Sequence, residues 1–224
     1  MKILGNTAIF LAAILLSVPV ARGQDLSKYR DFSLGVSLTT VSNQVNAKPT
    51  DASIIQKSPA LIQELSWWPT QSYQPSAPTQ SVEGILFSFY NGQLYKIVVT
   101  YESAATRGLT SADMVRALSA VYGVATVPVA EKKPTAMGAY SDTEDAVASW
   151  ENSQYSVTLS QSPLSDAFQL VMFSKEVNGR ADAAIATAVR QYREDAPQRK
   201  AASVKKEADD LAALRQTNLK AFRP

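Results

Sequence analysis

The chain contains no cysteine and no histidine among its 224 residues. Without cysteine it can form no disulfide bond, so its stability must come from burial of apolar side chains. Without either residue, the common zinc sites and the common pairings of a nucleophile with a base cannot be built. Any catalysis would depend on carboxylates, Lys, Tyr or Ser, and we expect no metal and no cofactor.

The first 23 residues differ in character from the rest of the chain. Met1 and Lys2 form a short basic start, an apolar stretch is densest over 8–16, and 21–23 ends in small residues. This three-part pattern is typical of a secretory signal peptide cleaved before Gln24, and an uncleaved N-terminal anchor is the alternative. The apolar stretch falls short of the about 20 residues that cross a bilayer. We therefore predict a secreted or periplasmic protein without a membrane span after cleavage.

The chain has no large excess of positive or negative charge. The chain carries 22 Lys and Arg against 20 Asp and Glu, and cleavage after Gly23 would remove two basic residues and no acidic one. A neutral mature chain lacks the basic excess that nucleic-acid binding needs, so we expect no nucleic-acid partner. Apolar residues make up 46% of the composition, which is enough for a packed core.

Two short stretches share a glycine, a hydroxyl residue two positions later, and apolar residues at helical spacing. They begin at Gly35 and Gly108. Ser37 and Thr110 stand where helix N-caps belong, and Asp113 follows Thr110 at nearly capping-box spacing. Each stretch therefore predicts a helix. The second helix should end at Gly123 and bury one face, formed by Met114, Val115, Leu118, Val121 and Tyr122.

Strand patterns follow each predicted helix. They cover 60–68, 82–90 and 93–101 after the first, and 146–150, 155–161 and 167–175 after the second. We therefore predict an α+β fold, in which two helix-plus-antiparallel-meander units form a mostly antiparallel sheet followed by a C-terminal helical tail. The expected divisions are a signal peptide at 1–23, units at 24–107 and 108–178, and the tail at 179–224.

The pattern Gly-x-[Ser/Thr] with helical apolar spacing, followed by a meander, resembles the BamE/SmpA type of envelope module. Tandem copies of that architecture also occur in β-lactamase inhibitor proteins. The likeness covers 35–45 and 108–123 together with the strand order. The chain lacks the lipidated cysteine of the first group and the disulfides of the second. What the resemblance implies is protein binding rather than catalysis.

Asn91-Gly92 separates two strand patterns and is the strongest short-range signal of a two-residue hairpin turn. Pairing outward from this turn places Ser88 opposite Tyr95 and Leu86 opposite Ile97. One side of the ribbon then carries Ile85, Phe87, Phe89, Leu94 and Val98, interrupted by Lys96. The other side carries Leu86, Ser88, Tyr90, Tyr95, Ile97, Val99 and Tyr101.

Three tyrosines on one side of this hairpin amount to about 500 Å² of aromatic surface, near the top of what monomers leave bare. Either the C-terminal helix or the second unit covers this face, or a partner docks on it. Trp67 and Trp68 are neighbours on a strand and point to opposite faces, so one belongs to the core and the other can join the tyrosines. A core or loop-anchoring role for both tryptophans is the other interpretation. The candidate binding residues are therefore Trp67, Trp68, Tyr90, Tyr95 and Tyr101.

The Ala-rich segment after Gly179 is predicted to be helical, with an interruption at Pro197. Its apolar stripe consists of Val204, Ala208, Leu211, Leu214 and Phe222. Three interpretations remain open for this tail: a solvated helix face, a partner helix or short coiled coil, and contact with an anionic membrane surface.

These patterns favour a non-enzymatic module that binds another protein or a peptide through the aromatic sheet face and the loop at 69–80. One alternative is a structural envelope component that acts through its C-terminal helix. The other is an envelope hydrolase built on paired carboxylates. The acidic run at 142–145 lacks the spacing of a calcium loop, and Ser203-x-x-Lys206 lacks the further elements of penicillin-recognising enzymes. We interpret the first as a solvated turn and the second as chance.

Overall fold

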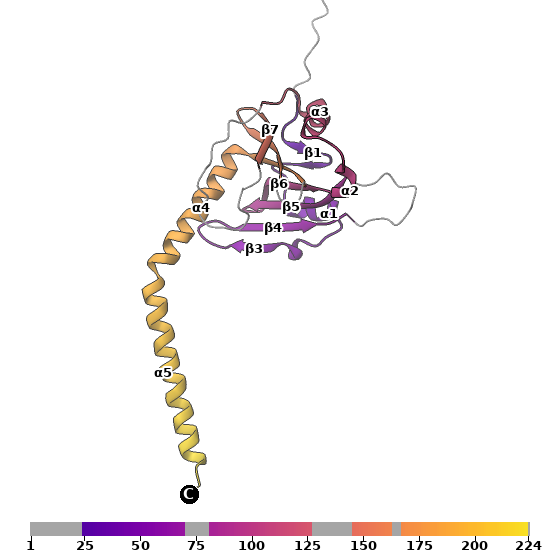
Figure 1. Cartoon of the computed structure of the whole chain (residues 1–224). Helices are drawn as coiled ribbons and strands as arrows, with labels where there is room; N and C mark the ends of the chain where they lie inside the picture. The colour runs from indigo at the N-terminus through magenta and orange to yellow at the C-terminus, as the bar shows by residue number, and fades with distance from the viewer. Residues whose placement is uncertain (1–23, 70–80, 127–144, 163–166, 224) are drawn as a thin grey trace, which may run out of the picture.

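The computed structural model of the chain describes residues 24–69, 81–126, 145–162 and 167–223 (Figure 1). The predicted signal peptide, the loop predicted at 69–80 except for Pro69, and the acidic run at 142–145 except for Asp145 lie outside these residues. In chain order the elements are β1 (Lys28–Tyr29), β2 (Phe32–Ser33), α1 (Leu38–Gln44), η1 (Pro49–Asp51), β3 (Ser53–Gln56), β4 (Ile62–Trp67), β5 (Val82–Tyr90), β6 (Gln93–Tyr101), α2 (Ser103–Thr106), α3 (Ser111–Tyr122), β7 (Asp145–Glu151), β8 (Tyr155–Gln161), β9 (Phe168–Ser174), α4 (Lys175–Glu194) and α5 (Ala196–Ala221).

A seven-stranded antiparallel sheet forms the centre of the molecule, in the order β3-β4-β5-β6-β9-β8-β7 (Figure 1). The meander that follows α1 and the meander that follows α3 join where β6 pairs with β9. β1 and β2 form a separate two-stranded sheet. The predicted α+β class, with a mostly antiparallel sheet and a C-terminal helical tail, is therefore confirmed.

The main core lies on one face of the large sheet, which we term the first face. Fully buried side chains of β5, β6, β8 and β9 form its floor, among them Phe87 and Leu159. Tyr29, Val41 and Met114 cover them from β1, α1 and α3. The alternation of apolar and polar residues along each strand makes this possible, because successive side chains point to opposite faces.

Side-chain caps fix the N-termini of α1 and α3, as the sequence predicts. The Thr40 amide donates to the Ser37 hydroxyl at 3.2 Å, which begins α1. At α3, the Asp113 amide donates to the Thr110 hydroxyl at 3.2 Å, and the Thr110 amide donates to the Asp113 carboxylate at 3.0 Å. Gly123 ends α3 with a φ of 91°, a conformation that favours glycine.

The buried face of α3 is narrower than predicted. Met114 and Tyr122 are buried, and Val115 and Leu118 pack partly against the core. Val121 is exposed, so its assignment to the buried face is wrong. The reason is geometric, because adjacent helical residues are about 100° apart and Val121 falls at the edge of the arc centred between Leu118 and Tyr122.

The β5–β6 hairpin departs from the predicted pairing between two register shifts, one next to Tyr95 and one between Val82 and Gly84. Phe89 pairs with Leu94 as predicted, but Ser88 then pairs with Lys96, and Tyr95 is the extra residue of a β-bulge. The predicted pairings of Ser88 with Tyr95 and of Leu86 with Ile97 are therefore wrong.

The bulge changes which side of the ribbon the rest of β6 occupies. Ile97, Val99 and Tyr101 join the main core on the first face, whereas Lys96 and Val98 lie on the opposite, second face. A one-residue slip inverts every later side chain of a strand. The inversion is favourable here because the three side chains that it buries, Ile97, Val99 and Tyr101, are apolar or aromatic. The predicted grouping of Tyr101 with Tyr90 and Tyr95 on one face is therefore wrong.

Candidate functional surface

The second face of the sheet carries Tyr95, and α4 covers it there. Tyr95 is only 6% exposed and forms a small buried cluster with Ile62 and Ala181. Tyr90 packs partly against the same cluster, together with Val177 and Ile185 of α4. Ala181 carries no side chain beyond Cβ, so the helix can approach the tyrosine ring closely. α4 thus covers Tyr95 and part of Tyr90. This agrees with the alternative in which the C-terminal helix covers this face of the hairpin.

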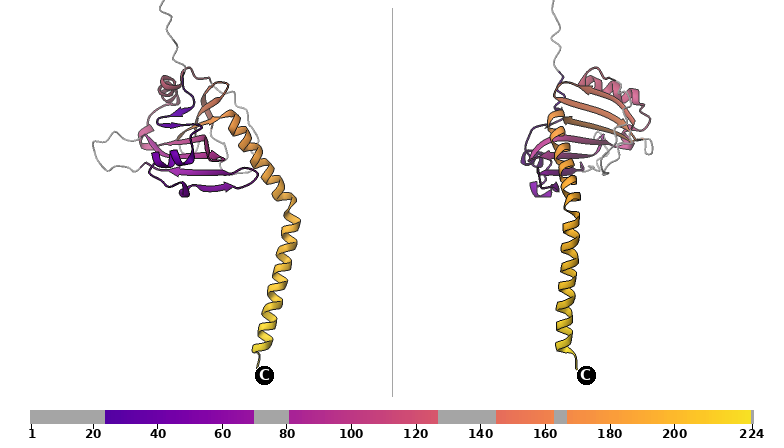
Figure 2. Two further views of the ribbon diagram at one scale, coloured as in Figure 1. Left: turned by 180° about the vertical axis from the view of Figure 1, so that it is seen from behind. Right: turned by 90° about the vertical axis from the view of Figure 1, so that its left-hand side faces the viewer.

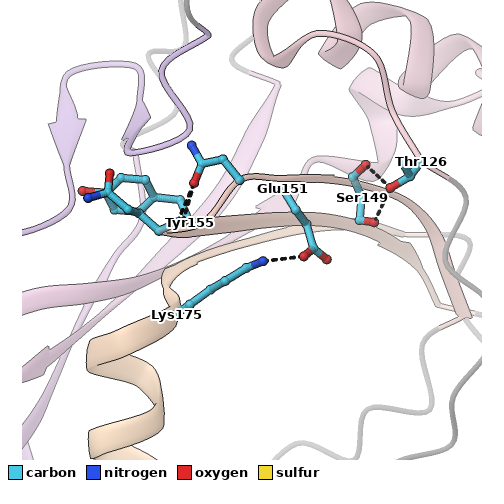
Figure 3. A network of polar contacts seen from close by, with 7 residues as sticks. Thr126, Ser149, Glu151, Tyr155 and Lys175 are labelled. Atoms are coloured by element: carbon cyan, nitrogen blue, oxygen red, sulfur yellow. Dashed lines mark hydrogen bonds and ion pairs between the residues drawn. The ribbon is translucent and has the colours of Figure 1, made fainter.

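Polar contacts attach the start of α4 to the β7–β8 turn (Figure 3). The Lys175 amide donates to the Gln154 carbonyl at 2.9 Å, and its ammonium lies 2.5 Å from the Glu151 carboxylate. The Asn152 side chain accepts from the Gln154 and Tyr155 amides at 2.8 and 2.7 Å and so shapes the turn. The ion pair is partly solvent-exposed and contributes under about 1 kcal/mol, so the apolar cluster is the main attachment of α4.

Burial determines the protonation of Tyr95. Removal from water, followed by the nearby carboxylates of Glu64 and Asp182, raises the pKa of its hydroxyl to about 12. All three causes disfavour the phenolate. Tyr95 is therefore a neutral packing residue over the physiological pH range, with no tendency to act as a nucleophile.

Replacing Ala181 by leucine is expected to lower the free energy of unfolding by about 1–3 kcal/mol, because the added methyl groups overpack the seam between α4 and the sheet. Ala183 provides a matched control, since the same helix exposes it to solvent. Ala183→Leu should leave stability within about 0.5 kcal/mol of the parent. Urea unfolding of both variants measures the difference, and equal midpoints would show that α4 does not pack on Tyr95.

Tyr101 lies in the main core beside two further phenols, Tyr29 and Tyr122. The Tyr122 hydroxyl donates to the Lys28 carbonyl at 3.3 Å. Burial raises the pKa of all three phenols. The Trp150 indole is also buried and donates to the Gly123 carbonyl at 2.9 Å. These aromatic residues serve packing, and the polar atoms of Tyr122 and Trp150 find partners inside the protein.

The two adjacent tryptophans have separate environments. Trp67 packs partly in the main core, where its ring meets Phe32 at a centroid distance of 6.0 Å. Trp68 is 68% exposed, and its indole lies beside Gly84, at which a Cβ would stand 3.1 Å from the ring. One tryptophan is therefore in the core and the other outside it, as predicted. The structure does not bring the five candidate residues together on one open face.

Among the elements of the described residues, α5 carries the most exposed large apolar side chains. This helix of 26 residues projects away from the sheet, and each of its residues is exposed (Figures 1 and 2). Exposed large apolar side chains recur along it, namely Val204, Leu211, Leu214, Leu219 and Phe222. Leu219 extends the stripe predicted from the sequence.

A contact between the two C-terminal helices marks their junction at Asp195. The Arg199 guanidinium lies over the Tyr192 ring, 3.7 Å from its centroid, and also donates to the Tyr192 carbonyl. Pro197 occupies the first turn of α5, where its missing amide hydrogen costs nothing. The predicted interruption at Pro197 is thus the start of a second helix.

Charge is distributed unevenly between the two parts of the chain. Residues 24–174 contain nine Lys and Arg against thirteen Asp and Glu, whereas 196–223 contain seven against three. Residues 24–174, which we term the sheet domain, therefore carry a formal charge of about −4. Residues 196–223, which comprise α5 and the two residues after it, carry about +4. The near-neutral total conceals this separation.

Within the described residues, no group of three Asp or Glu side chains is placed to hold a metal ion, and no helix is long and apolar enough to cross a membrane. Comparison with protein-family models, with curated proteins and with solved structures finds no match to the chain. The resemblance to BamE/SmpA-type modules and to inhibitor repeats therefore stays a prediction.

Proposed function

We propose that this protein is a non-enzymatic interaction module of the cell envelope or the extracellular space, and that α5 is its contact surface. The observation that supports this proposal is the row of large apolar side chains that α5 exposes to solvent. The aromatic sheet face is the weaker candidate because α4 already covers Tyr95. The proposal thus moves the binding role from the sheet to the C-terminal helix.

The length of α5 and its lack of a packed face support an interaction role. A helix of 26 residues is about 39 Å long, and most helices of proteins are stabilised by packing an apolar face. α5 packs no such face in the described part of the chain. Contact with another surface would bury the stripe and stabilise the helix, and the sheet domain would serve as a rigid base.

The proposal predicts that two leucine truncations on α5 detach the protein from its binding site in cells. Leu211→Ala with Leu219→Ala keeps helix propensity but removes apolar surface, so retention in a washed envelope fraction should fall at least about tenfold. Leu109→Ala with Ile54→Ala provides a matched control, because both side chains are exposed on the sheet domain. Unchanged retention of the α5 variant, together with loss from Trp68→Ala, would contradict the proposal.

A further inference from the structure

We propose, resting on the function proposed above, that residues 211–223, the end of α5 and the two residues after it, bind the surface of an anionic lipid bilayer. The helix would lie along the headgroup region with its apolar side chains inserted and with Arg215 and Arg223 near lipid phosphates. Lys220 lies on the opposite side of the helix, where it contributes through the longer-range attraction of the anionic surface. The sheet domain would stay in water. This proposal commits to lipid as the occupant of the exposed stripe.

The apolar side chains of this segment lie within one arc of the helix. At about 100° per residue, Leu211, Leu214, Leu219 and Phe222 fall within about 140° of each other. All four are more than half exposed, and they line a single shallow apolar depression with Arg215 and Asn218. A broad arc of this kind suits insertion into an interface, where no narrow seam is required.

The charges of the segment have one sign. Asp210 is the last acidic residue of the chain, and the charged side chains after it are Arg215, Lys220 and Arg223. Arg215 lies inside the apolar arc, but its long side chain can place its stem among acyl chains and its guanidinium at the phosphates. The acidic sheet domain is repelled by the same surface, so the basic end of α5 is the part that approaches it.

A second copy of the chain is a less suitable occupant of this stripe. The heptad spacing that starts at Val204, Ala208 and Leu211 continues to Arg215 and Asn218, so pairing would bury a guanidinium and an amide in the seam. Parallel pairing would also bring together two segments that each carry about +4. A helix that docks in a protein groove uses apolar anchors at i, i+3, i+4 and i+7. After Leu211 only the i+3 position, Leu214, is apolar, because Arg215 and Asn218 occupy the other two.

The experiment is co-sedimentation of the full chain with vesicles of phosphatidylglycerol and phosphatidylcholine in equal amounts, and with vesicles of phosphatidylcholine alone. Mass spectrometry first establishes the amino terminus, because a retained apolar leader would itself bind lipid. We expect binding to the anionic vesicles at least about tenfold tighter than to the neutral ones, and weaker at high salt. Variants differing only in α5 isolate the contribution of that helix.

Two α5 variants and one control test the chemistry. Leu211→Ala with Leu219→Ala should weaken binding at least about tenfold, and Lys220→Glu with Arg223→Glu should abolish the preference for anionic lipid. The control is Lys57→Glu with Arg107→Glu, which makes the same charge change at two exposed positions of the sheet domain. This control should bind as the parent does or slightly less tightly.

The outcomes separate this inference from the proposed function. No vesicle binding, while the leucine variant still leaves the envelope fraction, would overturn the lipid assignment and keep α5 as a contact surface for protein. Self-association in sedimentation velocity, abolished by the same substitutions and without lipid binding, would show that a second copy covers the stripe. Anionic vesicle binding that only the Lys57→Glu, Arg107→Glu variant loses would overturn both proposals.

Discussion

Phe87→Ala is expected to lower the free energy of unfolding by about 3–5 kcal/mol, the range for removing a buried aromatic ring from a core. Phe87 is 0% exposed, lies on the interior strand β5, and packs against the Phe32 ring at a centroid distance of 4.7 Å. The substitution removes apolar burial and leaves a cavity between the sheet and the β1–β2 hairpin. Urea unfolding followed by far-ultraviolet circular dichroism measures the loss.

The same substitution at Phe222 is the matched control. Phe222 is 72% exposed at the end of α5, so truncation should change stability by no more than about 0.5 kcal/mol. Comparable losses at Phe87 and Phe222 would contradict the placement of the main core on the first face. A large loss at Phe87 alone would confirm that the β1–β2 hairpin covers the sheet.

Stability is expected to fall steeply as the pH rises above 10, by up to about 3 kcal/mol between pH 10 and 11. The phenols of Tyr29, Tyr95, Tyr101 and Tyr122 are buried, and burial raises the pKa of each above 10, to about 12 for Tyr95. In this pH range the unfolded chain loses protons that the folded chain keeps. Proton release therefore favours unfolding, by up to about 1 kcal/mol for each of Tyr95, Tyr101 and Tyr122, and Tyr29 acts in the same direction.

Urea unfolding at intervals from pH 8 to 11 measures this effect. The free energy of unfolding should show no tyrosine-dependent change below about pH 9, because the phenols are then protonated in both states. Tyr101→Phe should reduce the decrease above pH 10 by one phenol, whereas Tyr192→Phe should not, since Tyr192 is 69% exposed. Ionisation of all four phenols near pH 10 in the folded protein, seen as phenolate absorbance, would contradict their burial.

Alternating patterns and turn residues predicted several strands to the residue. β5, β6 and β8 have the bounds expected from the sequence, and the Asn91-Gly92 turn lies between the first two. Local chemistry suffices there, because both turn residues accept positive φ and strand side chains alternate. The N-caps of α1 and α3 were predictable for the same reason, since a cap depends only on residues within one turn.

The β-bulge at Tyr95 was not predictable from the hairpin alone. The turn favours continuous pairing, and the bulge becomes favourable only because it turns Ile97, Val99 and Tyr101 toward the main core. That core is formed largely by distant residues, such as Tyr29 and Leu159. A local pattern cannot weigh such burial, so the faces predicted for β6 are correct as far as Tyr95 and wrong from Lys96 onward.

The short strands and the exact course of the C-terminal helices also required the three-dimensional structure. β1, β2 and β3 have two to four residues each, too few for an alternating pattern to stand out. α4 begins at Lys175, within the strand predicted at 167–175, because its first residues bind the β7–β8 turn. The stripe of α5 was visible in the sequence, but its exposure depends on the direction in which the helix leaves the sheet (Figure 2).

The position of β9 between β6 and β8 determines when the sheet can close during synthesis. Lys96 pairs with Phe173, so the central ladder joins segments separated by most of the second meander. Until Phe168–Ser174 leaves the ribosome, β6 and β8 each present an unpaired edge, and open edges recruit strands of other chains. A nascent chain is therefore expected to be prone to aggregation until its last strand is made, and to need chaperone protection most during that interval. A chain that terminates before this strand keeps both open edges.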